Sequence, residues 1–549
     1  MSLKFLALSG TTGVTENLYV YEYGNDMIIV DCGIGFPDSG MYGVDLVVPD
    51  MDYIVKNKHK LRGAIITHGH EDHIGAIPFL LEKLDTTIYA SKLTAGFIKD
   101  KLKDYKIRGA KIHVFNPERD TLSIGVFKVT PFRISHSVPD AVALAIDTPE
   151  GMMFHVSDYK FDWTPVDGKP FDISKASILA SGGVLGLASD SLGATNPGFT
   201  VSEKEIEGRV EVIARKSQGQ IFFTTMSSNI SRVQQAINVA GRLNRKVAFF
   251  GRSIDKKSEI ARKLGYLHFP KNIVLDRKEI LNIKPSQRMC LVSGAYGQPG
   301  SALYRMAMGT HDQIKIQKGD TVIFSGDPSP PGSKATVDDL VDKFIEMGVD
   351  IHYYDMQEDL HVSGHGSQED INILFSLVKP KYYIPIGGTI RHNRAYREMA
   401  ESLGAKSDQV FELSPGDVVE FKNNRARKAK KIPIQEVLVD GLGVGDVGSI
   451  VLRDRQILAK EGVAIAVLQF NRAERRLVGR PDIISRGFVF EKQHKDFLVA
   501  TADKLKEILI KKKLNSDSFI KNETIDFLEK YFNKQTGRRP MIIPVVIEV

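Results

Sequence analysis

The chain has 549 residues, too many for one hydrophobic core, so about three or four domains are expected. Its two cysteines exclude a disulfide-stapled scaffold, and a net charge of +7 favours an anionic partner. Because the sequence contains neither a signal-peptide core nor a long uncharged apolar run, we expect a cytoplasmic protein that does not span a membrane.

The first chemically informative region is an apolar run, followed by a polar motif and then by a helix. Residues 63–67 are short, apolar and β-branched, which predicts a buried strand, and residues 74–84 predict an amphipathic helix with proline in its first turn. Between them, the stretch THGHEDH places four metal-binding side chains within six residues: His68, His70, Asp72 and His73. This pattern favours a buried transition-metal site over isolated core histidines.

The spacing in this motif indicates two metal positions. Side chains two residues apart in an extended segment share a face, so His68 and His70 can bind one ion. Asp72 and His73 lie where the chain turns into the helix and can bind a second. Asp31 closes the earlier strand 27–30 and is better placed to orient a ligand histidine than to bind metal.

Further ligands are expected at the ends of two later strands. Residues 126–134 predict a strand that delivers His136, and residues 152–156 predict one that delivers Asp158. A carboxylate at Asp158 can bridge two cations. Considered individually, each of these residues could equally be a cap or turn residue.

The middle of the chain alternates between strands and helices, which predicts a parallel sheet with helices on its faces over residues 202–357. Strands are expected at 220–225, 246–250 and 321–324. Each is followed by small or hydroxylic residues, whose exposed N–H groups suit phosphate, although ordinary turns explain them equally well.

The predicted domain boundaries follow from these patterns. We expect a metal-binding domain in two parts, 1–201 and 358–421, with 202–357 inserted between them. The lysine- and arginine-rich stretch 422–436 is interpreted as a solvated linker, and 437–549 as a small α/β domain.

The motifs resemble those of a known family. Asp31, THGHEDH, His136 and Asp158 resemble the motif series of the metallo-β-lactamase fold. Residues 189–191, the turn 228–231 and the loop 361–369 resemble the acidic motif, the RNA-contacting turn and the phosphate-holding loop of β-CASP nucleases. Over nearly its whole length the chain is similar to the ribonuclease J family. The resemblance implies an α/β protein: a metallo-β-lactamase αββα sandwich with an inserted parallel-sheet β-CASP domain and a small C-terminal α/β domain.

The resemblance also implies a function. The chain would be a zinc-dependent ribonuclease of RNA maturation and decay, including rRNA processing. It would act on single-stranded RNA as a 5′-to-3′ exonuclease on 5′-monophosphorylated ends, with some endonuclease activity, and would form a homodimer or homotetramer. Two zinc ions per subunit are expected, although manganese would accept the same ligands.

Residue roles follow from the same resemblance. One ion would be held by His68, His70 and His136, the other by Asp72 and His73, with Asp158 between them. His365 would contact the scissile phosphate or help the leaving oxygen depart, and Asp190 would position it. Asp72, His365 and Asp190 are thus the expected catalytic residues. Substrate contacts are expected from Ser228, Asn229, Ile230, Ser231, His361, Val362, Ser363, Gly364 and His365.

One departure keeps two other functions open. Gly387 stands where the family usually carries a last metal-ligand histidine, and the five-residue offset of His392 prevents a simple replacement. A ligand from elsewhere in the chain, a water, or a weaker second site are the options. The alternatives are a non-catalytic or weakly active RNA-binding partner subunit and a small-molecule metallohydrolase. The inserted domain counts against the latter.

Overall fold

The computed structural model describes residues 1–38, 40–326, 333–353, 360–441, 443–488, 495–512 and 514–549. These residues form two compact units, Met1–Phe36 with Leu46–Val437, and Pro37–Asp45 with Leu438–Val549. The predicted boundary at Gln357 lies outside the described residues. In the described part of the chain, no helix combines the length and apolar character needed to cross a bilayer.

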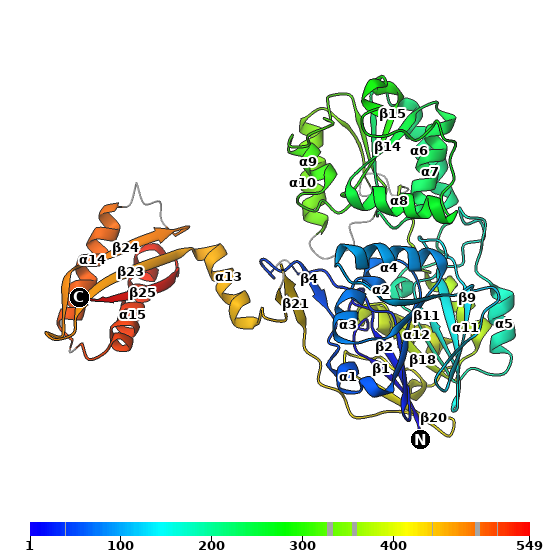
Figure 1. The fold of residues 1–549 in the computed structure, drawn as a ribbon, viewed down its shortest axis with the longest axis horizontal. Coiled ribbons are helices and arrows are strands. Elements are labelled where there is room, and N and C mark those ends of the chain that lie inside the picture. Colours follow the sequence, from blue (N-terminus) through cyan, green and yellow to red (C-terminus); the bar gives the residue numbers. More distant parts are fainter. Residues whose placement is uncertain (39, 327–332, 354–359, 442, 489–494, 513) are drawn as a thin grey trace. The chain divides into compact units, whose positions relative to one another are not determined.

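Two sheets form the framework of the first unit (Figure 1). The eight-stranded sheet runs, in spatial order, β20 (Arg425–Lys428), β19 (Val418–Lys422), β1 (Leu3–Ala7), β2 (Tyr19–Tyr23), β3 (Asp26–Val30), β5 (Leu61–Ile66), β6 (Thr87–Ala90) and β7 (Lys111–Val114). The six-stranded sheet runs β18 (Tyr382–Ile386), β12 (Gly186–Asp190), β11 (Gly151–Val156), β10 (Val142–Thr148), β9 (Phe127–Arg133) and β8 (Leu122–Ile124).

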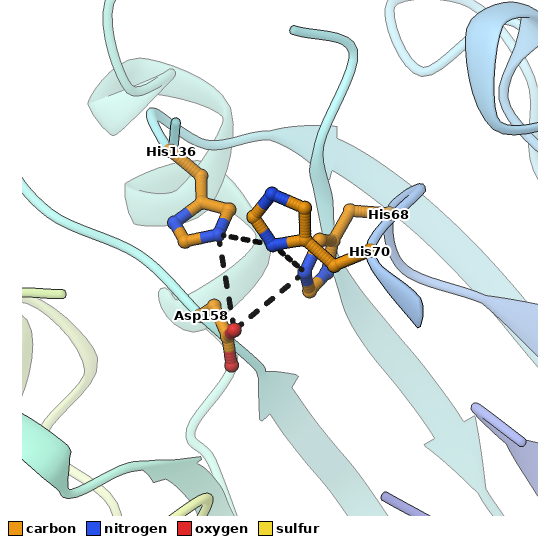
Figure 2. Close-up of side chains that lie close together, drawn as sticks. All are labelled: His68, His70, His136 and Asp158. Atoms are coloured by element: carbon orange, nitrogen blue, oxygen red, sulfur yellow. Dashed lines mark hydrogen bonds and ion pairs between the residues drawn. The ribbon is translucent and has the colours of Figure 1, made fainter. Parts of the chain in front are cut away.

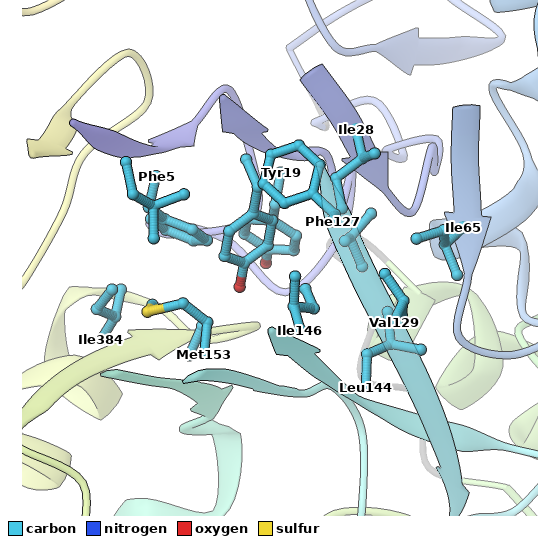
Figure 3. Close-up of a cluster of buried hydrophobic side chains, with 14 of the residues drawn as sticks. Phe5, Tyr19, Ile28, Ile65, Phe127, Val129, Leu144, Ile146, Met153 and Ile384 are labelled. Carbon is cyan, nitrogen blue, oxygen red and sulfur yellow. The ribbon is translucent and has the colours of Figure 1, made fainter. Parts of the chain in front are cut away.

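The two sheets share a hydrophobic core. Tyr19, Ile28 and Ile65 from the first sheet lie with Leu144 and Met153 from the second in one cluster of buried side chains (Figure 3). Burying each such aliphatic side chain contributes about 1.5–3 kcal/mol. Because strand side chains alternate between faces, the remaining apolar residues point outward and need a covering of helices.

Helices supply that covering. A second buried cluster joins the six-stranded sheet to α5 (Ile173–Ala180), α11 (Gln368–Val378) and α12 (Ile390–Ser402). The other helices of this part are α1 (Asp52–Lys56), α2 (Glu71–Ile74), α3 (Ile77–Lys83) and α4 (Lys92–Asp104), and α4 contacts β6 and β7. The predicted αββα sandwich is therefore confirmed.

The single helix predicted over residues 74–84 is wrong in detail. The chain forms α2 and α3 with a break at Gly75 and Ala76. The Ala76 N–H donates to the Cys32 carbonyl at 2.9 Å instead of continuing the helix. Gly75 also packs closely against the segment that contains Ile34. A Cβ at residue 75 would lie 2.6 Å from a side-chain carbon of Ile34.

The inserted segment contains a separate sheet, and its predicted parallel arrangement is confirmed. The strand order is β14 (Lys246–Phe250), β15 (Arg288–Val292), β13 (Ile221–Thr224), β16 (Thr321–Phe324) and β17 (Asp350–His352). Its helices are α6 (Lys204–Lys216), α7 (Ile230–Arg242), α8 (Arg252–Leu264), α9 (Ala302–Ala307) and α10 (Ser333–Glu346).

The interpretation of 422–436 as a solvated linker is wrong for its first part. Arg425–Lys428 form β20, an edge strand paired with β19 through a turn at Asn423 and Asn424, both of which have positive φ. Asparagine tolerates this conformation, which suits a tight hairpin turn, and charged side chains are typical of protected edge strands. The basic residues thus form one edge strand of the eight-stranded sheet.

The second unit has a three-stranded sheet, β24 (Arg476–Arg486), β23 (Val463–Asn471) and β25 (Met541–Glu548). One face packs on α14 (Lys495–Ile510) and α15 (Asp517–Thr536) around Leu468, Leu505 and Phe532. The unit also contains α13 (Ser449–Glu461) and residues 37–45, which no sequence signal assigned to it. The remaining short strands of the chain are β4 (Leu46–Val48), β21 (Val437–Asp440) and β22 (Gly443–Val444).

Candidate metal centre

The metal-binding motifs gather because the strands that precede them end at corresponding edges of the two sheets. In the six-stranded sheet β9, β11, β12 and β18 run in the same direction, since β9 and β11 are both antiparallel to β10 and the other pairs are parallel. Their carboxyl ends deliver His136, Asp158, Asp190 and Gly387. β5 of the eight-stranded sheet leads into His68 and His70.

The first group of ligands consists of His68, His70, His136 and Asp158, all buried, with one candidate ligand atom from each lying within 4.8 Å of the others (Figure 2). His70 Nδ1 lies 3.2 Å from His68 Nε2 and 3.1 Å from His136 Nε2. Asp158 Oδ2 lies 3.5 Å and 3.8 Å from the same two Nε2 atoms. Three nitrogens and one oxygen this close together could hold one metal ion.

The second group is Asp72, His73 and Asp158. His73 Nε2 lies 3.4 Å from Asp72 Oδ2 and 3.3 Å from Asp158 Oδ2. Asp158 is therefore shared between both groups, as the sequence predicts for a bridging carboxylate. The structure thus brings the predicted ligands together in these two groups, and their binding of metal stays a prediction.

Hydrogen bonds at the opposite ring nitrogens fix the imidazoles. His73 Nδ1 contacts Asp31 Oδ2 at 2.8 Å, the contact that the predicted orienting role of Asp31 requires. His136 Nδ1 lies 2.8 Å from the Gly364 carbonyl, which accepts its proton. His68 Nδ1 lies 3.0 Å from the Thr67 hydroxyl. Such partners set the tautomer of a ligand histidine and direct its other nitrogen to the metal.

Burial also sets protonation in the form that binds metal. Burial lowers the pKa of His68 and His136 well below the ordinary value, and that of His70 to about 3, so these rings are neutral. Burial opposes the charge on His73 too, but Asp158, Asp72 and Asp31 raise its pKa. Burial alone would raise the pKa of Asp158, whereas His73 and His365 hold it well below its usual range. The three neutral imidazoles and the ionised Asp158 fit a divalent cation at the first position, whereas His73 has to give up a proton to bind a cation at the second.

Half-buried His365 and buried Asp190 form a pair beside Asp158. His365 Nδ1 lies 2.6 Å from Asp190 Oδ2, and His365 Nε2 lies 3.9 Å from Asp158 Oδ2. Burial alone would lower the pKa of His365, but Asp190 and Asp158 raise it to about 9. The imidazole is therefore protonated at neutral pH and can donate a proton.

The predicted phosphate-holding loop lies against a metal ligand. A Cβ at Gly364 would come within 2.7 Å of His136 Cε1, so only glycine fits there. Ser363 Oγ accepts the His365 N–H at 3.0 Å, and Lys160 Nζ donates to the Ser363 carbonyl at 3.0 Å. Val362 is buried, and His361 is half-buried.

The predicted RNA-contacting turn has a different character. Ser228, Asn229, Ile230 and Ser231 are all buried. Asn229 Oδ1 accepts the Arg232 N–H and caps α7. Contacts from this turn to a phosphate would therefore come from its backbone more readily than from its side chains.

Sequence reasoning missed several residues that support the site. Asn17 Nδ2 lies 3.1 Å from His73 Nε2, and Ser137 Oγ lies 3.2 Å from His70 Nε2. A buried ionic cluster is formed by Arg232, Glu203 and Lys160. Arg232 contacts the Leu360 carbonyl and Lys160 the Ser363 carbonyl, so the cluster reaches the loop that contains His365. No local pattern indicates these residues, because their partners lie far away along the chain.

Gly387 borders the same centre. An ideal Cβ at this position would lie 3.3 Å from Asp190 Oδ1 and 3.9 Å from Asp158 Oδ1, and φ is +68°. A side chain at residue 387 would thus start between the two carboxylates. His392 contacts Thr389 at the start of α12, where it takes part in capping the helix.

Three parts of the chain match known protein families. Residues 11–172 match the metallo-beta-lactamase superfamily. Residues 218–344 match the ribonuclease J beta-CASP domain, and residues 450–549 match the ribonuclease J C-terminal domain. A crystal structure of a protein of unknown function from Enterococcus faecalis V583 covers 76% of this chain and all of its own, with a TM-score of 0.54 and 14% identity. That likeness concerns the fold alone.

Similar proteins extend over the whole chain. Ribonuclease J2 of Bacillus subtilis (strain 168) is 35% identical, covering 100% of this chain and 99% of its own length. Ribonuclease J 1 of Streptococcus pyogenes serotype M3 is 37% identical, covering 98% and 97%. Ribonuclease J 2 of Staphylococcus aureus (strain MRSA252) is 34% identical, covering 100% and 98%. The predicted resemblance is therefore confirmed, and the chain belongs to the ribonuclease J family.

Proposed function

We propose that the chain is a metal-dependent ribonuclease that hydrolyses phosphodiester bonds of single-stranded RNA. The observation that carries the proposal is the pair of ligand groups sharing Asp158, placed directly beside the His365–Asp190 pair. A two-cation centre next to a positioned proton donor is suited to hydrolysis of a phosphate ester. The names of the similar proteins agree with this substrate class.

Each group in the centre has a separate task. Bound cations would supply Lewis acidity and lower the pKa of water at the phosphate. The His365 imidazolium would donate its Nε2 proton to the leaving oxygen, while Asp190 holds the ring through Nδ1. The Ser363–Gly364 segment positions this imidazole and the His136 ring together, because it contacts both.

The finer proposal is a 5′-to-3′ exonuclease on 5′-monophosphorylated RNA with some endonuclease activity, located in the cytoplasm. Two zinc ions per subunit are proposed because each group combines imidazole nitrogens with carboxylate oxygen, the set that zinc prefers. Manganese is the second candidate metal. The buried, unpaired cysteines Cys32 and Cys290 fit a reducing compartment.

The test is cleavage of a 3′-labelled, 5′-monophosphorylated single-stranded RNA by the full chain with added zinc or manganese. Asp72→Asn serves as the variant, because it removes a carboxylate ligand with little change in shape. A matched DNA strand and a 5′-hydroxyl RNA serve as substrate controls. We expect the wild type to release nucleotides stepwise from the phosphorylated RNA alone, and the variant to lose this activity.

Intact RNA with both metals would contradict the proposal. RNA binding without cleavage would then favour a partner subunit, for which Gly387 at the edge of the centre is the structural argument. Hydrolysis of a thioester or lactone with no action on RNA would favour the small-molecule metallohydrolase.

A further inference from the structure

The second metal position has few protein donors. Its group contains Asp72, His73 and Asp158, and Asp158 is shared with the first position. The first position, in contrast, has three imidazole nitrogens of its own. A further donor for the second position has to lie close to Asp158.

Asp190 lies next to Asp158. It ends β12, the strand next to β11, and is 2% exposed. Candidate ligand atoms of Asp158, Asp190 and His365 also lie within 4.8 Å of one another, forming a third group that shares Asp158. Two buried carboxylates repel each other at this distance, and a cation between them removes the repulsion.

The two aspartates use their oxygens unequally. Asp158 Oδ2 faces the histidines, whereas its Oδ1 has only a long contact, 3.4 Å, with Ser157 Oγ. Asp190 Oδ2 contacts His365, and its Oδ1 accepts the Leu192 N–H at 2.8 Å. A carboxylate oxygen has a second lone pair, so Asp190 Oδ1 retains acceptor capacity.

Gly387 leaves space at these two Oδ1 atoms. β18, which precedes it, pairs with β12 so that Ile386 lies opposite Asp190. The position of an ideal Cβ at residue 387 has Asp190 Oδ1 and Asp158 Oδ1 as its near neighbours, at 3.3 Å and 3.9 Å. A side chain would fill this space, whereas glycine leaves it for an ion or its water.

We propose that Asp190 is a ligand of the second cation, binding through Oδ1 on the Gly387 side while Oδ2 keeps its contact with His365. This assignment rests on the proposed two-cation ribonuclease. It gives the second position two aspartates and one histidine besides the shared Asp158, and it explains how the centre can hold two ions with glycine at residue 387. Asp190 would then act on both the metal and the proton donor.

The competing role for Asp190 is only to position His365, and zinc binding separates the two. Zinc would be titrated into the metal-free full chain by calorimetry, and bound zinc counted by elemental mass spectrometry after dialysis at fixed free zinc. We expect two equivalents in the wild type. Asp190→Asn should weaken the second equivalent by about 10–100-fold or more. His365→Gln, the matched control, should keep both equivalents, because it removes the partner of Asp190 without removing the carboxylate.

A gain-of-binding variant protects the test against simple misfolding. Gly387→His places an imidazole beside the two Oδ1 atoms, and histidine is among the residues that tolerate positive φ. We expect Gly387→His to raise the affinity for the second zinc ion in the wild-type background. In Asp190→Asn, we expect the same substitution to restore binding of that ion. Asp190→Asn with wild-type affinity for both ions, or Gly387→His with no change in the second, would overturn the assignment.

Activity on RNA reports on the proposed function separately. A wild type that binds two zinc ions but cleaves no RNA would agree with the ligand assignment and contradict the proposed ribonuclease activity. A wild type that cleaves RNA with a single bound equivalent at saturating zinc would overturn the assignment alone.

Discussion

At the scale of single residues, burial gives ordinary side chains unusual protonation states. His68, His70 and His136 are neutral because they are removed from water, whereas His365, which is half-buried, is cationic because two carboxylates face it. These four imidazoles thus divide into three that suit metal binding and one that suits proton donation. Their neighbours, more than their residue type, determine which role each takes.

His365→Gln tests the proton donor. Loss of general acid catalysis should lower kcat by about 10²–10⁴-fold while bound zinc is unchanged. The pKa of His365 is raised to about 9, so the donor is protonated below that pH and lost as the pH rises through it. Bound cations move this value downward, and the wild-type rate should therefore fall at or below about pH 9.

The measurement is kcat against pH on 5′-monophosphorylated RNA for both proteins. Because the variant has no imidazole to titrate, its residual rate should lack the wild-type alkaline fall. An identical alkaline limb in wild type and variant would show that another group donates the proton.

At the scale of elements, a buried ionic cluster joins the inserted segment to the sandwich. Arg232 on α7 contacts Glu203 at 2.7 Å, and Lys160, just after β11, contacts the same carboxylate at 3.5 Å. Arg232 Nη1 also donates to the Ser325 hydroxyl at the end of β16, and its contact with the Leu360 carbonyl at 3.4 Å reaches the loop that carries His365. The cluster therefore holds the loop that carries His365 from both the inserted segment and the sandwich.

Glu203→Gln should destabilise this junction strongly, because it removes the carboxylate that pairs with buried Arg232 at 2.7 Å and leaves Lys160 with Asp162 at 3.8 Å. Breaking such a pair costs about 3–5 kcal/mol. Native-state hydrogen exchange of the α7 amides measures the local effect. The control is Glu548→Gln, whose contact with Arg472 is exposed and where a change of at most about 1 kcal/mol is expected.

The same cluster predicts an acid dependence. Burial alone would raise the pKa of Glu203, but Arg232 and Lys160 lower it to about 2. The stabilisation is complete above the ordinary glutamate pKa near 4.3 and is lost as the pH falls towards 2. Wild-type α7 protection should therefore decline more steeply across this window than that of Glu203→Gln, and parallel declines would contradict the prediction.

The sequence predicts elements with a strong local pattern and misses those defined by distant partners. The runs 246–250 and 321–324 predict β14 and β16 exactly where they lie, because apolar β-branched and aromatic residues are bounded by turn residues. The candidate ligands at strand ends can be predicted for the same reason, because the strands before them have a strong local pattern. β20 was missed because an edge strand of arginine and lysine lacks an apolar pattern. The Arg232 contacts to Glu203 and Leu360 span 29 and 128 residues, which no local window detects.

At the scale of the whole molecule, the second unit presents an apolar sheet face. Val463, Ile465 and Val467 on β23 are half-buried, and Ile543 and Val545 on β25 are 41% and 39% exposed on the same side. The opposite face packs on α14 and α15. A contiguous apolar face of this kind is typical of a protein interface, as the homodimer or homotetramer implied by the family resemblance would need.

Ile543→Lys should weaken self-association, because a charge would be buried at the centre of this face. We expect the dissociation constant to rise by roughly tenfold or more, which corresponds to about 1.4 kcal/mol. Analytical ultracentrifugation over a concentration series measures it. The matched control is Ile510→Lys, which replaces an exposed isoleucine at the end of α14. An unchanged constant for Ile543→Lys would exclude this face as the interface.

The pairing of β1 with β19 has a consequence for biosynthesis. Leu3 lies opposite Phe421, so the first strand made has one of its two neighbours in place only after more than four hundred further residues. At about 5–20 residues per second, a ribosome needs roughly 20–80 s to supply them. Throughout that interval an apolar strand edge stays open on the nascent chain, while β2 already covers its other side. Slow or paused translation between these strands would therefore prolong the aggregation-prone stage, and a chaperone that shields the N-terminal segment would act at this time.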